Sequence, residues 1–335
     1  MTYEPVSWRK RVALGVTGLV ALVLVAWLVA AFKDFTRGTR VGSGGALDVP
    51  APVPVLREHA ATIGVPDSML GVSRALRFRT LTPAEAIAVP GFMDVLGEPA
   101  IRTPGVHEVA AADGTPFAYL VLRPFADKRG EMLDGYRLGR WPAERWIMAK
   151  NYFNPDGFVE VTAATASLPL TPHFTLGDFV THDQRATWPK YVVLEEKLLD
   201  KLELVLQELN TRGIPTRHVV VLSGFRAPYY NDRGVGEGMA RGSRHQYGDA
   251  ADIVIDDNGD GRMDDLNRDG RVDLADTRPV ALALARVEAK HQALVGGLGT
   301  YTAMGPSGPF VHIDVRGTSA RWESGWWRKR GTGQP

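Results

Sequence analysis

Two histidines and one aspartate in the C-terminal half of the chain have the residue types and spacing of metal ligands. His245 and Asp252 lie within the segment 243–252, SRHQYGDAAD. The small residues between them let the chain fold back, so that an imidazole nitrogen and a carboxylate oxygen can converge on one ion. A catalytic zinc site usually has three protein ligands and an open position for water. The third candidate ligand is His312, in the segment 310–314, FVHID.

Asp314 is the other chemically useful residue of this second segment. Residues two apart in a strand point to the same face, so Asp314 can act beside a metal bound by His312. The chain contains no cysteine, and any metal must therefore be held by His, Asp or Glu. The remaining histidines lack such motifs and are interpreted as structural, although two of them could line a cleft. Those two are His173 and His182, and the others considered are His59, His107 and His218.

Three motifs together resemble a known enzyme family. They are Ser-Gly-Phe-Arg at 223–226, Ser-x-His-x-x-Gly-x-Ala-x-Asp at 243–252, and Phe-Val-His-x-Asp at 310–314. They resemble the zinc D-alanyl-D-alanine carboxypeptidases and related murein endopeptidases with the hedgehog-like fold. The resemblance extends from Leu168 to Trp322 and implies an α+β domain, with an antiparallel sheet and flanking helices. It also implies zinc-dependent hydrolysis of D-amino-acid-containing peptide bonds of peptidoglycan.

The resemblance implies roles for individual residues as well. It makes His245, Asp252 and His312 the zinc ligands and turns Arg226 toward the substrate. A guanidinium can bind a peptide carboxylate in bidentate fashion or stabilise an oxyanion. Several family members carry a carboxylate three positions before the last histidine ligand, where this chain has a proline. Asp314 is the candidate general base in its place.

The expected mechanism is attack of a metal-activated water on a peptide carbonyl, with a carboxylate as proton acceptor. Pro309, at the position of the family's carboxylate, leaves an alternative open. In that alternative the chain is a catalytically impaired, zinc-containing protein that binds the cell wall or acts as a scaffold. A peptidase acting on proteins is a weaker third hypothesis. The motifs leave open D,D- or L,D-bond specificity, and endopeptidase or carboxypeptidase action.

An acidic insert, residues 256–276, carries one metal-binding pattern twice. Oxygen-bearing side chains at loop positions 1, 3, 5, 9 and 12, with glycine at position 6, are the pattern of a calcium loop. The second loop ends just before a predicted helix, resembles dockerin-type and EF-hand loops, and is the stronger candidate. The ligands would be Asp256, Asn258, Asp260, Asp264 and Asn267 in the first loop, and Asp265, Asn267, Asp269, Asp273 and Asp276 in the second.

The insert therefore predicts structural calcium in addition to catalytic zinc. Magnesium fits less well, because a cage of many carboxylates suits the larger ion. The competing interpretation is a solvated acidic turn, since Asn-Gly and Asp-Gly pairs are common in turns.

The elements that must position these residues follow from the hydrophobic pattern. Apolar residues recur at helical spacing over 194–209, and Gly213 follows where a helix C-cap belongs. Residues 218–222 predict a buried strand that leads into the Ser-Gly-Phe-Arg motif. A second helix is predicted after Pro279, and a short strand over 310–315. This order of helices and strands indicates an α+β fold.

The N-terminal region predicts a membrane anchor. Residues 12–32 run for about twenty residues without a charge, enough to cross a bilayer as a helix. Arg9, Lys10 and Arg11 precede them, so the positive-inside rule keeps the tail 1–11 in the cytoplasm. The catalytic domain would then be periplasmic or otherwise extracytoplasmic. A cleaved signal peptide is the alternative, although its apolar core would be unusually long.

Three further regions are predicted after the anchor. Residues 33–54 are rich in Gly, Ser and Pro, as in a flexible linker. Residues 55–165 carry mostly strand signals and form a β-rich accessory region, whose aromatic residues are either core or a ligand platform. Residues 166–335 form the zinc peptidase domain. The accessory strands expected are 106–109, 117–122 and 157–162.

Composition excludes some classes of function. The 335 residues are 44% hydrophobic and 23% charged, which is typical of a globular chain with at least one full core. Lys and Arg number 39 against 38 Asp and Glu, so there is no broad positive field for a phosphate backbone. Nucleic acid is therefore not an expected partner. The expected partners are peptidoglycan peptides and, through the N-terminal helix, the membrane.

Overall fold

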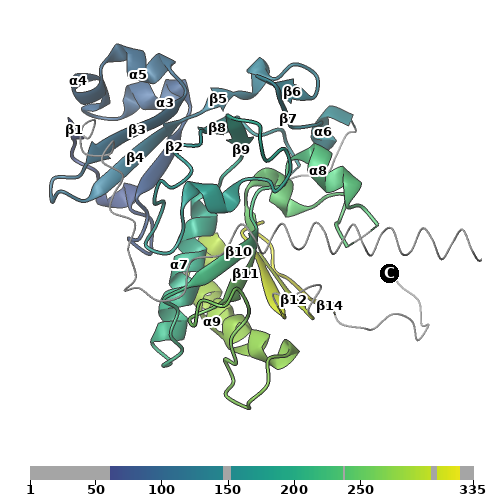
Figure 1. Ribbon diagram of the computed structural model, residues 1–335. Coiled ribbons are helices and arrows are strands. Elements are labelled where there is room, and N and C mark those ends of the chain that lie inside the picture. Colours follow the sequence, from purple (N-terminus) through teal and green to yellow (C-terminus); the bar gives the residue numbers. More distant parts are fainter. Residues whose placement is uncertain (1–60, 146–151, 237, 303–307, 325–335) are drawn as a thin grey trace, which may run out of the picture. The chain divides into compact units, whose positions relative to one another are not determined.

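The structure, a computed structural model, describes residues 61–145, 152–236, 238–302 and 308–324. These residues form an α+β protein with small sheets (Figure 1). The predicted tail 1–11, anchor 12–32 and linker 33–54 lie outside the described residues. Of the helices that the structure describes, none combines the length and the apolar character needed to span a bilayer.

A five-stranded sheet carries two of the three candidate ligands. Its neighbouring strands are antiparallel, except that β12 (Gly297–Tyr301) and β14 (Ala320–Ser324) are parallel. The predicted strands 218–222 and 310–315 are confirmed to within one residue. Asp252 and His312 are direct partners across the middle strand pair. The spatial order is β10 (Val219–Ser223), β11 (Ala250–Ile255), β13 (Phe310–Asp314), β12 (Gly297–Tyr301) and β14 (Ala320–Ser324).

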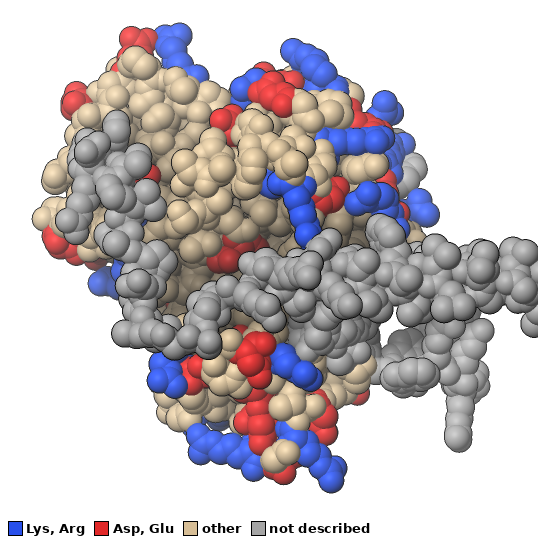
Figure 2. All heavy atoms as spheres, viewed as in Figure 1, with Lys and Arg blue, Asp and Glu red and all other residues tan. Residues whose placement is uncertain are grey.

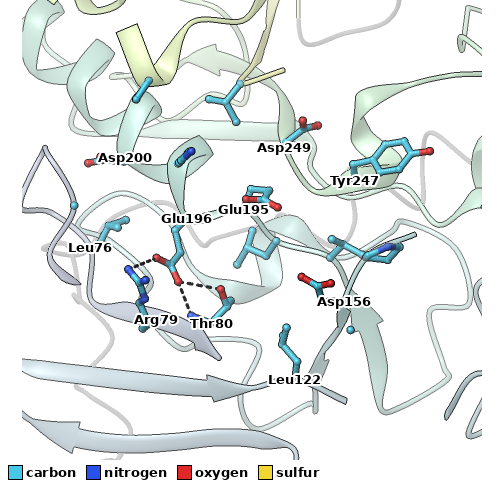
Figure 3. A pocket seen from close by; sticks show the side chains of 18 of the residues that line it. Leu76, Arg79, Thr80, Leu122, Asp156, Glu195, Glu196, Asp200, Tyr247 and Asp249 are labelled. Carbon is cyan, nitrogen blue, oxygen red and sulfur yellow. Dashed lines mark hydrogen bonds and ion pairs between the residues drawn. The ribbon is translucent and has the colours of Figure 1, made fainter. Parts of the chain in front are cut away.

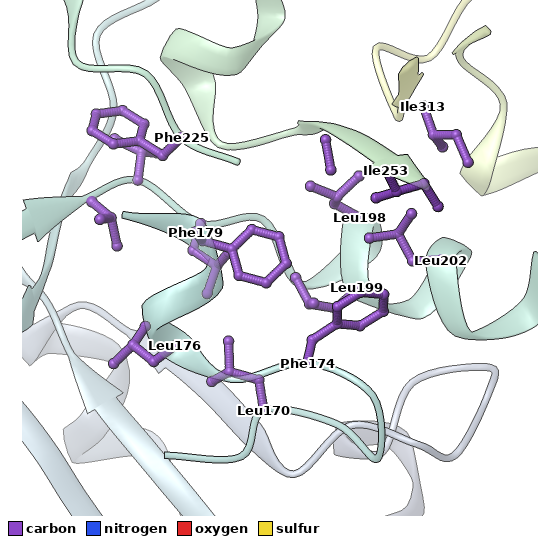
Figure 4. Packing of buried hydrophobic residues seen from close by; sticks show 14 of the residues in the cluster. Leu170, Phe174, Leu176, Phe179, Leu198, Leu199, Leu202, Phe225, Ile253 and Ile313 are labelled. Atoms are coloured by element: carbon purple, nitrogen blue, oxygen red, sulfur yellow. The ribbon is translucent and has the colours of Figure 1, made fainter. Parts of the chain in front are cut away.

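Two helices, α7 (Glu196–Asn210) and α9 (Thr277–Lys290), pack against each other beside this sheet (Figure 1). Strand side chains alternate between faces, so Ile253 and Ile313 point away from the side of Asp252 and His312. Both isoleucines belong to the core that also contains Leu198, Leu199 and Leu202 of α7 (Figure 4). One face of the sheet is thus apolar and covered, and the other carries the candidate ligands.

Both long helices were predicted from the sequence, and both are confirmed. Gly213 follows the end of α7 with a φ of 73°, a left-handed conformation that glycine adopts without strain. Pro279 lies in the first turn of α9, where the N–H that proline lacks would have no intrahelical partner.

A four-stranded sheet forms the N-terminal part of the described chain. Its order is β1 (Ala61–Thr62), β3 (Gly105–Ala110), β4 (Pro116–Val121) and β2 (Phe78–Leu81). It has a core of its own, which includes Phe92 and Tyr119. The predicted strands 106–109 and 117–122 correspond to β3 and β4. Three short helices were not expected here, namely α3 (Pro83–Ala88), α4 (Phe92–Leu96) and α5 (Glu98–Arg102).

Smaller elements connect the two sheets. The predicted strand 157–162 is β8 (Gly157–Val161), which pairs with β9 (Lys190–Val192) across the boundary expected between residues 165 and 166. The larger core crosses this boundary too, because it joins Trp141 and Phe158 to Phe225. The strands are β5 (Arg123–Pro124), β8 (Gly157–Val161), β9 (Lys190–Val192), β6 (Met132–Leu133) and β7 (Tyr136–Arg137). The helices are α6 (Pro142–Arg145) and α8 (Pro228–Arg233), with 3-10 turns at Asp67–Met69, Phe125–Asp127, Leu176–Phe179, Arg244–Tyr247, Leu274–Asp276 and Gln292–Leu294.

The surface shows charges of both signs. On the face drawn in Figure 2, basic and acidic side chains are interspersed over the described residues. This distribution agrees with the near balance of 39 basic and 38 acidic residues in the sequence.

Candidate metal centre

Three buried side chains meet at the five-stranded sheet. The Nε2 atom of His245 lies 3.2 Å from Oδ1 of Asp252 and 3.1 Å from Nδ1 of His312. That Nδ1 atom lies 2.9 Å from the same aspartate oxygen. Ligand atoms around a tetrahedral zinc are about 3.3 Å apart when the metal bonds are about 2.0–2.1 Å long. Among the described residues, this is the group of His, Asp and Glu side chains close enough together to hold one metal ion.

Local backbone structure brings His245 to the two strand residues. His245 lies in the 3-10 turn Arg244–Tyr247, which ends at Gly248 with a φ of 66°. A Cβ atom at Gly248 would lie 2.1 Å from the carbonyl oxygen of Val193, so glycine is required there for close packing. The chain then enters β11 directly, and Asp252 follows opposite His312.

Hydrogen bonds behind the two histidines orient their rings. Nδ1 of His245 lies 2.7 Å from the carbonyl oxygen of Gly224, which can only accept, so Nδ1 carries the proton. Nε2 of His312 lies 3.0 Å from Oδ2 of Asp314 and donates to it. The second nitrogen of each ring therefore faces the other ring and Asp252. Such outer partners commonly fix the orientation of metal-binding histidines.

Asp314 lies on the far side of the His312 ring from the other two candidate ligands. It is fully buried and accepts hydrogen bonds from the N–H of Gly297 at 2.7 Å and from Nε of Arg316 at 2.9 Å. A general base must reach the water that it deprotonates, directly or through one other water. The position of Asp314 favours a role in holding His312 over the base role expected from the sequence.

Arg226 also lies against a candidate ligand. Its Nε donates to Oγ of Ser223 at 2.7 Å, and its guanidinium forms an ion pair with Oδ2 of Asp252. This pair occupies one aspartate oxygen and leaves Oδ1 facing the histidines. The arginine side chain is only 13% exposed. The sequence predicted that Arg226 faces the substrate, and the structure adds this contact with Asp252.

Two aromatic residues beside His312 received no role from the sequence. The ring of Trp322 lies 5.2 Å from that of His312, and its Nε1 donates to the hydroxyl of Tyr301 at 2.7 Å. A Cβ atom at Gly299 would lie 2.4 Å from Nε1 of Trp322, so the glycine makes room for the indole. Gly299 is the strand partner of His312. A glycine inside a strand often marks the close approach of another group, and this was the sequence signal for the position of the indole.

Electrostatics favours a cation at this point. Burial lowers the pKa of His245 to about 4, so its imidazole is neutral at pH 7. Burial opposes ionisation of Asp252, but the two histidines and Arg226 outweigh it and hold the pKa of this carboxyl well below its usual range. For His312, hydrogen bonds to Asp252 and Asp314 outweigh the effect of burial and raise the pKa. The ionised Asp252 and the neutral His245 are in the protonation state that metal binding requires, whereas a protonated His312 must release the proton on Nδ1 when a metal binds.

The acidic insert forms two loops with the same hydrogen bonds. Asp256 accepts from the N–H groups four and five positions later, at 2.9 and 2.8 Å. Asp265 repeats this pattern at 3.1 and 2.8 Å. Asn258 and Asn267 each accept from the N–H two positions later. The glycine at position 6 has a φ of 82° in the first loop and 83° in the second. The predicted repeat is therefore a structural repeat as well.

The other predicted calcium ligands cap the same loops. Asp276 is buried and accepts from the N–H groups of Asn267 and Asp273 at 3.2 and 2.8 Å. Asp264 accepts from the N–H of Asp257 at 2.7 Å. Asp260 and Asp269 each accept from the N–H two positions later. In the described residues, no three carboxylates of the insert converge closely enough to form a group like that of His245, Asp252 and His312.

The described histidines that were interpreted as structural do not join the candidate centre. His173 contacts the carboxylate of Glu203 at 2.9 Å, and Nε2 of His107 lies 2.9 Å from the carbonyl oxygen of Thr103. His182 is exposed, and His59 lies outside the described residues.

Replacement of Asp314 by asparagine tests the role of this carboxylate. We expect zinc affinity to fall about 10- to 100-fold, because His312 loses a charged partner. Turnover of the variant, measured with enough zinc to fill the site, should fall much less. Affinity follows from titration against a competing chelator. Unchanged zinc affinity together with a large loss of kcat would instead identify Asp314 as the general base.

Comparison with protein-family models, curated proteins and solved structures found no match to this chain.

Proposed function

We propose that this chain is a zinc-dependent peptidase that hydrolyses D-amino-acid-containing peptide bonds of peptidoglycan. The observation that carries the proposal is the buried triangle of His245, Asp252 and His312, whose three potential ligand atoms lie 2.9–3.2 Å apart. The motifs at 223–226, 243–252 and 310–314 add the resemblance to zinc D-alanyl-D-alanine carboxypeptidases and murein endopeptidases. The mainly antiparallel sheet beside two helices is in keeping with the hedgehog-like fold of that family.

The donor atoms support zinc as the metal. Two imidazoles and one carboxylate form a set that suits zinc, whereas calcium and magnesium prefer oxygen ligands throughout. When bound, zinc lowers the pKa of a water molecule and polarises a substrate carbonyl. Around it, Arg226 fixes Asp252, and Asp314 fixes His312. Trp322 lies beside the ring of His312 and is hydrogen-bonded to Tyr301.

The charge pattern at the N-terminus supports a location at the cell wall. Residues 1–11 would remain in the cytoplasm, residues 12–32 would cross the membrane, and the peptidase would act on the periplasmic or extracytoplasmic side. Peptidoglycan would then be within reach of the site.

One experiment tests the function directly. The purified full chain is incubated with defined muropeptides, and the products are weighed by mass spectrometry. Fragments that depend on zinc and disappear with a chelator are expected, and their masses identify the bond cleaved. Two features favour the alternative of a wall-binding protein without activity, namely Pro309 and the contact of Asp314 with the far nitrogen of His312. Tight muropeptide binding without any product would establish that alternative.

The proposal includes calcium in the insert 256–276. Two successive loops with equivalent carboxylates, amides and glycines support it. Binding an ion would relieve the repulsion between neighbouring carboxylates. The insert follows β11 directly, so a stable loop would also help to hold the strand that carries Asp252.

Calcium is therefore expected to raise the melting temperature of the zinc-loaded chain. Binding to the folded state alone stabilises it by mass action, and millimolar magnesium should have a smaller effect. The rise should shrink in the double variant Asp269→Ala, Asp273→Ala. The measurement is thermal unfolding of protein first freed of bound ions. A melting curve that does not respond to calcium would identify the insert as an acidic surface loop.

A further inference from the structure

A second candidate site lies in a pocket of about 1100 Å³ whose lining includes none of the three candidate zinc ligands (Figure 3). Residues 68–85 and 153–157 form part of its wall, and the start of α7 forms another part. Residues 244–249 and 315–316 complete the wall beside the five-stranded sheet. Ligand pockets commonly have volumes of about 300–1000 Å³, so this pocket can hold a ligand larger than a single amino acid.

Some of the charged residues in the wall are already paired. The carboxylate of Glu196 contacts the guanidinium of Arg79 at 3.1 Å and also accepts from Thr80 (Figure 3). The carboxylate of Asp249 is held by the guanidinium of Arg244. These carboxylates have ion-pair partners and shape the wall.

Two other carboxylates in the same wall have no such ion-pair partner among the described residues. Within the described part of the chain, the side chains of Glu195 and Asp156 make no hydrogen bond or ion pair, and both are exposed. Figure 3 shows both carboxylates beside the open space of the pocket. Desolvation by the pocket wall raises the pKa of Glu195, and the nearby negative charges of Asp249 and Glu196 raise it further. The positive charges of Lys197 and Arg244 lower this pKa, but the raising effects are larger. A positive ligand group would be attracted to this part of the pocket.

The absence of a close carboxylate cluster among the described residues of the pocket favours one kind of cation. The carboxylates of the pocket are not among the described groups close enough together to hold one metal ion. An organic ammonium group can contact carboxylates that are farther apart, because its three N–H donors point in different directions. The carboxylates therefore favour an amine over a metal ion.

Apolar side chains lie in the same lining. Phe153 is 74% exposed and Val72 is 54% exposed, and both line the pocket. Exposed apolar side chains beside a polar cavity are a common feature of binding sites. They would contact the aliphatic part of a ligand whose charged end reaches the carboxylates.

We propose that this pocket binds a short peptide with a free ammonium group, which contacts Glu195 and Asp156 while aliphatic parts of the peptide lie against Phe153 and Val72. The proposal does not depend on the peptidase activity, because the site uses none of the candidate zinc ligands.

The test compares two blocked peptides that differ only in the ammonium group. Acetyl-Ala-Ala-Lys-amide and acetyl-Ala-Ala-norleucine-amide are titrated into the purified full chain by calorimetry. We expect the lysine peptide to bind at least about tenfold more tightly, as a charge-assisted contact would give. Glu195→Gln and Asp156→Asn should each reduce this preference, and the double variant should abolish it. Asp94→Asn, an exposed aspartate outside the pocket lining, is the matched control and should leave the preference unchanged.

Three results would overturn the proposal. One is equal affinity for the two peptides, and another is a preference that survives in the double variant. The third is a preference that disappears when a chelator removes zinc, because the peptide would then occupy the metal centre. Since the binding assay needs no hydrolysis, failure of the proposed peptidase activity would leave its outcome unaffected.

Discussion

Replacement of His245 or His312 by alanine is expected to abolish the proposed zinc binding and the proposed hydrolytic activity together. Each histidine supplies one of three converging atoms, and the two remaining side chains cannot complete a zinc site with three protein ligands. The fold should survive, because the core between α7 and the sheet does not include these imidazoles. Elemental analysis measures zinc, and circular dichroism confirms folding.

The control for this pair is His107→Ala. His107 contacts the carbonyl oxygen of Thr103, outside the candidate centre, so this variant should keep stoichiometric zinc. Full zinc occupancy in the His245 or His312 variant would remove that histidine from the ligand set. Loss of secondary structure in either variant would call for the more conservative His→Gln replacement, with the same zinc measurement.

Replacement of Lys201 by methionine is expected to cause the largest loss of stability. Lys201 is fully buried in α7, and its ammonium donates to Glu288 of α9 at 2.8 Å and to the carbonyl oxygen of Asp314 at 2.7 Å. Methionine fills similar space but leaves both acceptors without this donor. Breaking a buried ion pair from one side costs about 3 kcal/mol or more. Urea unfolding of the variant measures the change.

Lys197→Met provides the comparison on the same helix. Lys197 is exposed, and exposed substitutions usually change the free energy of unfolding by no more than about 0.5 kcal/mol. Equal free energies of unfolding for the two variants would show that the buried contacts of Lys201 do not stabilise the fold more than an exposed lysine does.

The sequence predicted the candidate zinc ligands because each lies in a short local motif. His245 and Asp252 share one segment, and His312 lies in a strand whose β-branched neighbours are recognisable. The partners of these residues could not be predicted in the same way. Sequence spacing does not determine the directions of side chains. It therefore could not show that Arg226 contacts Asp252, or that Asp314 contacts the far nitrogen of His312.

In the N-terminal part, the expectation of a β-rich region did not include the helix α3. Helix α3 has a capping box, in which Thr82 and Glu85 bond each other's backbone N–H, with Pro83 at its first position. This capping signal is present in the sequence, where strand signals surround it. The packing of Trp141 against residues beyond 165 could not be anticipated, because its indole donates to the carbonyl of Gln246, more than a hundred positions away.

The cross-strand pairing of Asp252 with His312 has a consequence for the order of folding and metal uptake. Main-chain pairing sets the separation of these two side chains, and the carbonyl of Gly224 aims the third. The geometry of the centre is thus determined by the sheet, unlike that of small zinc modules, which fold only around their ion. A chelator should therefore strip the chain reversibly and leave it folded. A suitable metal ion supplied after folding could then bind to a site whose geometry is already formed.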